Sequence, residues 1–275
     1  MQRILLVFAL CPAILHAFTN MKTTPAKVDD KMMSTYDRLA SRLVGRYAKE
    51  SECLQNNQLF VCVSGGPGGQ RSGKSTLSEA VSSRINELLR DESASVVLPM
   101  DGYHYTRAQL KAMGDSDDCP YSNEDLIARR GAPWTFDAEA CVRDFTRARE
   151  LGQASLPIYS RTKSDPIEDG ALLSKDTKIV LLEGNYLLAW GDERWRPLQT
   201  NRVFDETWYI ACRSLDDQRE RLVKRHLETW SVEKTRMFGE GEVGAGVKAD
   251  SNDMLNLVWI DDMSRKHADL IIDSE

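Results

Sequence analysis

The stretch "VSGGPGGQRSGKST", residues 63–76, decides the fold of this chain. It ends in "SGKST" and satisfies the pattern G-x-x-x-x-G-K-[ST] when Gly68 is taken as the first glycine. In such a loop, backbone N–H groups and the positive end of the next helix bind phosphates, a role that Lys74 would complete. An apolar strand pattern over 58–64 precedes the loop and a helical pattern over 77–89 follows it, which is the context that the loop requires. The sequence therefore predicts a nucleotide-binding phosphate loop.

The loop is longer than the common form G-G-P-G-S-G-K-S-T. Gly69-Gln70-Arg71 stands between "GGPG" and "SGKST", so Gly65 is the natural first glycine and the three residues look like an insertion. We expect nucleotide binding to survive, because the phosphate-facing end of the loop is intact. A catalytically weak nucleotide-binding regulatory protein remains an alternative. The residues predicted to bind ATP are Gly65, Gly66, Gly68, Ser72, Gly73, Lys74, Ser75 and Thr76.

Length and composition favour an ordinary globular domain. The 275 residues are 41% hydrophobic and 28% charged, enough apolar mass for one α/β core. The formal net charge of −6 argues against a surface built to hold nucleic acid, so we expect no nucleic-acid partner.

Apolar segments alternate with helical patterns along the chain. Continuous rather than alternating apolar strands predict a parallel sheet covered by helices on both faces, hence the α/β class. Two glycine-rich or polar regions, 114–123 and 239–249, are expected to be mobile loops. The predicted strands after the first are 95–100, 178–184, 207–212 and 268–273, and the main helices are 33–48, 137–151 and 215–227.

The N-terminus has a different composition. The apolar run 4–15 is too short to span a membrane but fits the h-region of a secretory signal, and the polar segment after it resembles the second part of the plastid presequence of diatoms and related algae. This predicts a plastid protein whose leader, 1–20, is removed and leaves no stable membrane insertion. The alternative is a cytoplasmic protein that begins at Met21.

Two acidic residues close predicted strands. Asp101 follows the strand 95–100, and Glu183 ends the strand 178–184. The carboxyl edge of a parallel sheet is where α/β proteins bind ligands. A carboxylate there can accept the proton of an attacking hydroxyl or hold Mg²⁺.

Six blocks of sequence carry a resemblance to a known family. The blocks occur in the order "VVLPMDGYHYTRAQL", "RRGAPWTFD", "LPIYSR", "IVLLEGNYLL", "RLVKRH" and "ADLIID", and the similarity covers roughly Leu59 to Ile272. They resemble the phosphoribulokinase/uridine kinase family, in particular its uridine kinase-like branch with "MDGFH…RRGAPxTFD…EGNYLLL". The resemblance implies a P-loop NTPase fold with a five-stranded parallel sheet and a helical lid, acting with ATP and Mg²⁺.

The resemblance also implies roles for individual residues. Asp101 corresponds to the catalytic base, and two lid arginines that lie on one helical face at i and i+4 would clamp the ATP phosphates. The catalytic set is thus Asp101, Lys74, Arg221 and Arg225. The implied acceptor-binding residues are Tyr103, His104, Arg130, Asp137, Tyr159 and Arg161. The metal would be held by Ser75 and Glu183, partly through water.

These residues together predict an ATP-dependent kinase that phosphorylates a hydroxyl of a small molecule. A nucleoside similar to uridine is the first acceptor, and a sugar or pantothenate is the alternative. Whether the chain is a monomer or a homo-oligomer stays open. The expected division is a targeting segment 1–20, a leading helical segment 21–57 and a P-loop kinase domain 58–275.

Overall fold

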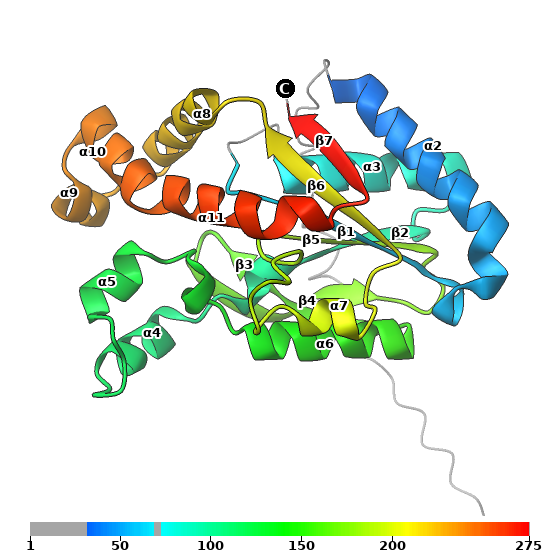
Figure 1. Cartoon of the computed structure of the whole chain (residues 1–275), viewed down its shortest axis with the longest axis horizontal. Helices are drawn as coiled ribbons and strands as arrows, with labels where there is room; N and C mark the ends of the chain where they lie inside the picture. The colour runs from blue at the N-terminus through cyan, green and yellow to red at the C-terminus, as the bar shows by residue number, and fades with distance from the viewer. Residues whose placement is uncertain (1–31, 69–72, 275) are drawn as a thin grey trace, which may run out of the picture.

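The computed structural model describes residues 32–68 and 73–274, so the expected targeting segment lies outside the described residues. Its centre is a five-stranded sheet in the order β2-β5-β1-β6-β7, and every neighbouring pair is parallel (Figure 1). The predicted α/β class and the five-stranded parallel sheet are confirmed. The strands are β1 (Leu59–Gly65), β2 (Ser95–Pro99), β5 (Ile179–Gly184), β6 (Glu206–Cys212) and β7 (Leu270–Ser274).

Helices cover both faces of the sheet, so the sheet lies between two hydrophobic cores. Alternate residues of β1 face one core or the other. Leu59, Val61 and Val63 pack with α2 (Met33–Glu50) and α3 (Lys74–Leu89). Phe60 and Cys62 face the other core, which contains side chains of α6 (Ala138–Leu151), α7 (Pro197–Thr200) and α11 (Met254–Ser264). The leading helix α2 therefore shares a core with the sheet, and Figure 1 shows it next to α3.

The register of the strands brings three chain segments to one edge. Glu183 on β5 lies opposite Val63 of β1 on one side and Pro99 of β2 on the other. The phosphate loop after β1, the short 3-10 helix η4 (Met100–Tyr103) after β2 and the end of β5 therefore meet at the carboxyl edge of the sheet.

Three helices form the expected lid at one end of the molecule, namely α8 (Leu215–Glu228), α9 (Val232–Phe238) and α10 (Gly241–Lys248) (Figure 1). They share a small core of their own. The prediction of a mobile loop at 239–249 was wrong, because most of it is α10. A π-helical turn, η6 (Ala249–Asp253), joins α10 to α11 without a break.

An antiparallel hairpin stands apart from the main sheet and was not anticipated. It consists of β3 (Ala154–Ser160) and β4 (Asp165–Leu173). Two short helices, α4 (Arg107–Gly114) and α5 (Asn123–Ala128), are joined by an irregular segment that includes most of the region 114–123. Short 3-10 turns also cover Ser51–Cys53, Gln55–Asn57, Pro133–Thr135 and Arg265–His267.

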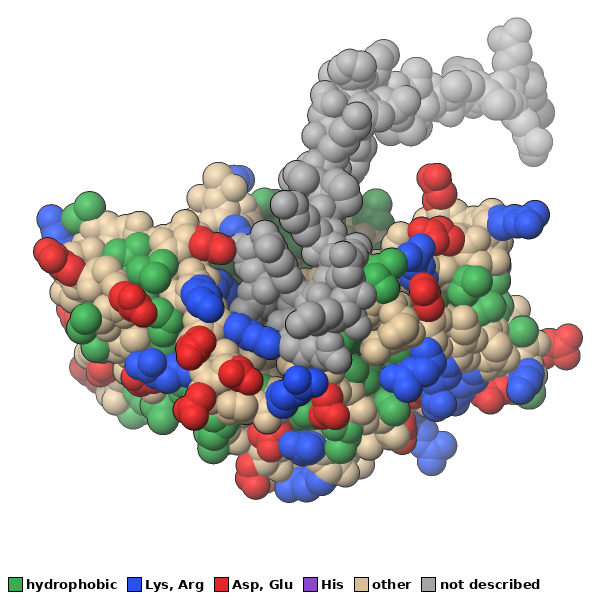
Figure 2. Space-filling model, turned by 90° about the horizontal axis from the view of Figure 1, so that it is seen from above, with side chains coloured by type: hydrophobic (Ala, Val, Ile, Leu, Met, Phe, Trp, Pro, Cys, Tyr) green, Lys and Arg blue, Asp and Glu red, His purple; other side chains and the backbone are tan. Residues whose placement is uncertain are grey.

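The surface carries charges of both signs. Acidic and basic side chains are interspersed over the face shown in Figure 2. Among the described residues, no helix combines the length and the apolar character that crossing a membrane requires.

Candidate active site

The described part of the phosphate loop is tightly packed at Gly66. A β-carbon on Gly66 would lie 2.0 Å from Cδ1 of Leu257 on α11, so a glycine is needed where the helix crosses the loop. Gly73 is the N-cap of α3, and Lys74 begins the helix. The Nζ atom of Lys74 donates a hydrogen bond to the carbonyl of Gly66 at 3.0 Å. The loop and the helix N-terminus thus form the cradle expected of a phosphate site.

The inserted segment itself lies outside the described residues, as does Ser72. Its two described flanks are close together, since a β-carbon on Gly68 would lie 3.3 Å from Cα of Gly73. The expected bulge at Gly69-Gln70-Arg71 stays a prediction. Thr76 lies in the first turn of α3.

Three charged side chains meet beneath this cradle. Lys74 and Glu183 are 8% and 6% exposed. Burial lowers the pKa of Lys74, and the negative charges of Glu183 and Asp101 oppose that change. Burial, and then the nearby charge of Asp101, raise the pKa of Glu183 to about 7, although Lys74 and a hydrogen bond from Ser75 act in the other direction. Lys74 and the Glu183 carboxylate therefore stabilise each other's charge, whereas the charge of Asp101 opposes ionisation of Glu183.

The residues present fit a magnesium ion. Ser75 lies at the start of α3 and donates its hydroxyl to Oε1 of Glu183 at 3.0 Å. A hydroxyl and a carboxylate at this distance offer hard oxygen ligands, and Mg²⁺ in nucleotide sites takes its remaining ligands from phosphates and water. The two residues named from the sequence are thus brought together.

Asp101 is fixed by the turn that follows β2. A β-carbon on Gly102 would lie 2.0 Å from the carbonyl oxygen of Pro157, so the turn packs directly on β3. The backbone carbonyl of Asp101 accepts a hydrogen bond from Nδ1 of His104 at 2.8 Å. Because a carbonyl can only accept, Nδ1 carries the proton, and Nε2 is left as an acceptor in the neutral ring. Burial lowers the pKa of His104, which favours this neutral form.

Aromatic rings surround His104. Its ring centroid lies 3.9 Å from that of Phe136 and 5.0 Å from that of Tyr159. The structure therefore brings His104 and Tyr159, two of the predicted acceptor residues, to the turn that holds Asp101.

Tyr103 does not have the position expected from the sequence. Its side chain is 4% exposed and belongs to the main core, where its ring packs edge-on against Phe145. Its hydroxyl donates to Asp144 on α6. The 3-10 turn thus directs this neighbour of His104 into the core, and contact of Tyr103 with an acceptor stays a prediction.

The other predicted acceptor residues have structural partners. Arg130 donates to Asp165 at 2.8 Å and to two backbone carbonyls, those of Tyr105 and Ser164. Asp137 is the N-cap of α6 and accepts from the N–H of Ala140. Arg161 is exposed in the turn between β3 and β4. Contact with an acceptor stays a prediction for Arg130, Asp137 and Arg161.

The lid reaches the phosphate loop through α8. Nη1 of Arg225 donates to the carbonyl of Gly68 at 2.7 Å, and Arg221 lies one turn earlier on the same helix. Gln218 was missed in the sequence, yet its Nε2 donates to the carbonyl of Pro67 at 2.6 Å. Nothing in the spacing distinguishes this glutamine from a solvated one.

A further group of residues, which resemble the family's block after the lid but received no role from the sequence, lies in the turn between lid and core. Asp253 pairs with Nε2 of His226 at 2.8 Å, which ties the π-helical turn to α8. Asn252 and Asn256 are buried and contact Arg129. The signal available in the sequence was their i, i+4 spacing near the start of an apolar helix.

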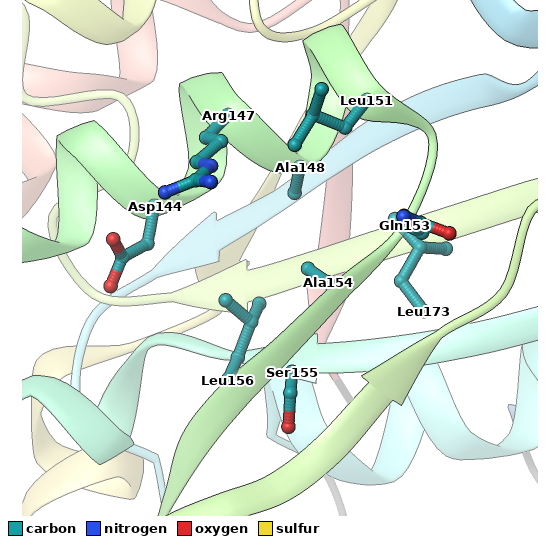
Figure 3. A pocket seen from close by; sticks show the side chains of 9 residues that line it. All are labelled: Asp144, Arg147, Ala148, Leu151, Gln153, Ala154, Ser155, Leu156 and Leu173. Atoms are coloured by element: carbon teal, nitrogen blue, oxygen red, sulfur yellow. The ribbon is translucent and has the colours of Figure 1, made fainter. Parts of the chain in front are cut away.

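A hollow of about 450 Å³ lies elsewhere, between α6 and the hairpin (Figure 3). Side chains of α6, among them Asp144 and Arg147, stand opposite those of β3. None of the predicted site residues lines it, and we assign it no part in the chemistry.

Fold and site together define a P-loop kinase. No family model matches the chain. The chain is 30% identical over 242 residues to "Putative uridine kinase C227.14" of Schizosaccharomyces pombe, covering 86% of this chain and 89% of that protein. It therefore belongs to the uridine kinase-like family of P-loop kinases.

Two further comparisons agree with this membership. The chain is 36% identical over 141 residues to "ATP-dependent kinase-like protein notR'" of Aspergillus versicolor, covering 50% of this chain and 76% of that protein. The crystal structure of a "putative fructose transport system kinase" from Silicibacter sp. TM1040 matches with a TM-score of 0.67 and 27% identity, over 85% of this chain and 98% of the other.

Proposed function

We propose that this chain is an ATP-dependent kinase that transfers the γ-phosphoryl group to a hydroxyl of a nucleoside-like acceptor. The observation that carries the proposal is the meeting of Lys74, Glu183 and Asp101 at the carboxyl edge of the sheet, directly beneath the phosphate loop. A protein that only binds nucleotide has no need of a carboxylate beside the acceptor elements.

In the proposed reaction, Asp101 takes the proton of the acceptor hydroxyl as its oxygen attacks the γ-phosphorus. The new oxygen–phosphorus bond forms while the bond from the γ-phosphorus to the bridging oxygen breaks, and ADP leaves. Lys74 and Arg225 offset the negative charge that is spread over the phosphoryl oxygens. When bound at Ser75 and Glu183, Mg²⁺ would neutralise part of the phosphate charge.

The acceptor side supports a substrate with several hydroxyl groups. The unprotonated Nε2 of His104 can accept a hydrogen bond from a hydroxyl beside the one that Asp101 activates. Family membership favours a nucleoside, whose ribose offers such a pair, and the name of the structural neighbour from Silicibacter makes a sugar the second candidate.

The test is ADP production from Mg·ATP by the full chain, measured with uridine, other nucleosides, D-fructose and pantothenate. We expect turnover with one acceptor class, loss of turnover in Lys74→Ala, and a decrease of roughly 10²–10⁴-fold in Asp101→Asn. Arg147→Ala, in the hollow beside α6, is the matched control and should behave as the wild type. ATP binding without turnover on any acceptor would instead support a regulatory protein.

A further inference from the structure

Two consecutive arginines, Arg129 and Arg130, have opposite electrostatic surroundings. Arg130 forms an ion pair with Asp165, with side chains 12% and 31% exposed, and also donates to backbone carbonyls. Its charge is neutralised and most of its donors are used. Among the described residues, no carboxylate lies within ion-pair distance of Arg129.

Neutral amides hold Arg129 instead. Its Nε donates to Oδ1 of Asn252 at 3.1 Å and its Nη2 donates to Oδ1 of Asn256 at 3.2 Å. The two amides are 2% and 4% exposed. They are held in turn, since Asn256 donates to Asn252 and Asn252 donates to the carbonyl of Arg130. Such a network fixes the guanidinium without cancelling its charge.

The amide-held guanidinium lies between the two halves of the site. Asn256 is followed by Leu257, the residue that contacts Gly66 in the phosphate loop. The guanidinium carbon of Arg129 lies 5.2 Å from the ring centroid of Trp134, in the block that also supplies Phe136 beside His104. Arg129 is thus linked through Asn256 to the helix turn that packs on Gly66, and it lies against Trp134 of the block that supplies Phe136.

We propose that Arg129, rather than Arg130, is the guanidinium on the acceptor side that binds an anionic oxygen during turnover. The anion is either an oxygen of the γ-phosphoryl group or an anionic group on the acceptor. This inference rests on the proposed function. A guanidinium held by amides keeps its full attraction for an anion, whereas one paired with a carboxylate has lost much of it.

The decisive variant is Asn256→Asp, which places a carboxylate on Arg129 with little change in shape. Asn256→Ala is the control: it removes both the acceptor for Arg129 and the donor to Asn252 and adds no charge, whereas Asn256→Asp keeps the acceptor and makes it anionic. We expect Asn256→Asp to lower kcat by roughly 10–100-fold below Asn256→Ala, since it neutralises a charge that acts on the reacting group. Arg129→Gln should reproduce the loss, and Arg129→Lys should retain part of the activity.

Binding measurements locate the anion. If Arg129 meets the γ-phosphoryl group, Asn256→Asp will bind Mg·ATP less tightly relative to Mg·ADP by calorimetry. If it meets an anionic group of the acceptor, such as the carboxylate of pantothenate, that ratio will be unchanged and the KM for that acceptor will rise. Equal kcat, KM and nucleotide affinities in Asn256→Asp and Asn256→Ala, or full activity in Arg129→Gln, would overturn the inference. A wild-type chain that binds Mg·ATP but phosphorylates nothing refutes the proposed function. In that case the ratio of Mg·ATP to Mg·ADP affinity, compared between Asn256→Asp and Asn256→Ala, tests the inference by itself.

Discussion

Replacing Glu183 with glutamine should stabilise the ligand-free protein while it impairs the site. Burial and the charge of Asp101 raise the pKa of Glu183 to about 7, whereas an unfolded glutamate titrates near 4.5. The folded state therefore binds a proton more tightly, and stability is lost as the pH rises through this interval. At about 1.4 kcal/mol for each pKa unit, the ionised carboxylate costs the fold roughly 3 kcal/mol above about pH 7.

The assay is urea denaturation without nucleotide or metal at about pH 5 and about pH 8. A glutamine at position 183 cannot ionise, and its amide oxygen can still accept the hydrogen bond from the hydroxyl of Ser75. The free energy of unfolding of Glu183→Gln should therefore exceed that of the wild type by roughly 1–3 kcal/mol at the higher pH. The two proteins should differ little at the lower pH. The exposed Glu92, in the turn before β2, provides the control Glu92→Gln, whose difference in stability from the wild type should not change between the two pH values. A variant that is less stable than the wild type at the higher pH would refute the reasoning.

Three more outcomes follow from the geometry. Gly66→Ala should weaken Mg·ATP binding by roughly tenfold, because the new β-carbon would lie 2.0 Å from a side chain of α11. The control Gly45→Ala, whose β-carbon would have nothing within 4 Å, should keep the wild-type affinity and gain up to about 1 kcal/mol of stability. The guanidinium of Arg149 donates to Asp205 at 2.6 and 2.8 Å, so Asp205→Ala leaves a buried charge without its carboxylate and should lower the free energy of unfolding in urea by roughly 3–5 kcal/mol. A decrease below about 1 kcal/mol would contradict this. Since burial lowers the pKa of His104, its protonation should reduce kcat/KM for the acceptor only below the ordinary histidine range. An acid limb that is identical in His104→Gln would assign that fall to another group.

Much of the fold was predictable because its signals are local. A few neighbouring residues are enough to identify each of three features: the apolar run of β1, the glycines after it, and the acidic residues at the ends of β2 and β5. The hairpin β3–β4 was missed because its residues are mostly half-exposed and show no clean alternation of apolar and polar side chains. Region 239–249 contains four glycines, which favour a loop by propensity, but α10 is stabilised by its packing on α8.

The roles of individual side chains in the site depend on which residues they contact in the fold, and the sequence does not show those contacts. Arg129 and Arg130 are adjacent and chemically identical, and only the positions of Asp165 and Asn256 distinguish them. The same holds for Tyr103, which a turn of the backbone directs away from its neighbour His104. The phosphate loop is a short continuous motif, whereas the proposed acceptor site draws on segments far apart in the sequence, namely the turn after β2, the hairpin and the first turn of α11.

The π-helical turn Ala249–Asp253 has a consequence for how the family can vary. Here the N–H of Met254 bonds to the carbonyl of Ala249, five residues back, so the turn holds one residue more than an α-helix would. Loss of a single residue from it would return the segment to an α-helix, because the five residues of the π-helical turn advance the chain by about the same angle as four residues of an α-helix. The lid would keep its orientation on α11, and only the contact between His226 and Asp253 would have to adjust. The wide turn can thus absorb a length difference of one residue between lid and core without turning α8 away from the phosphate loop.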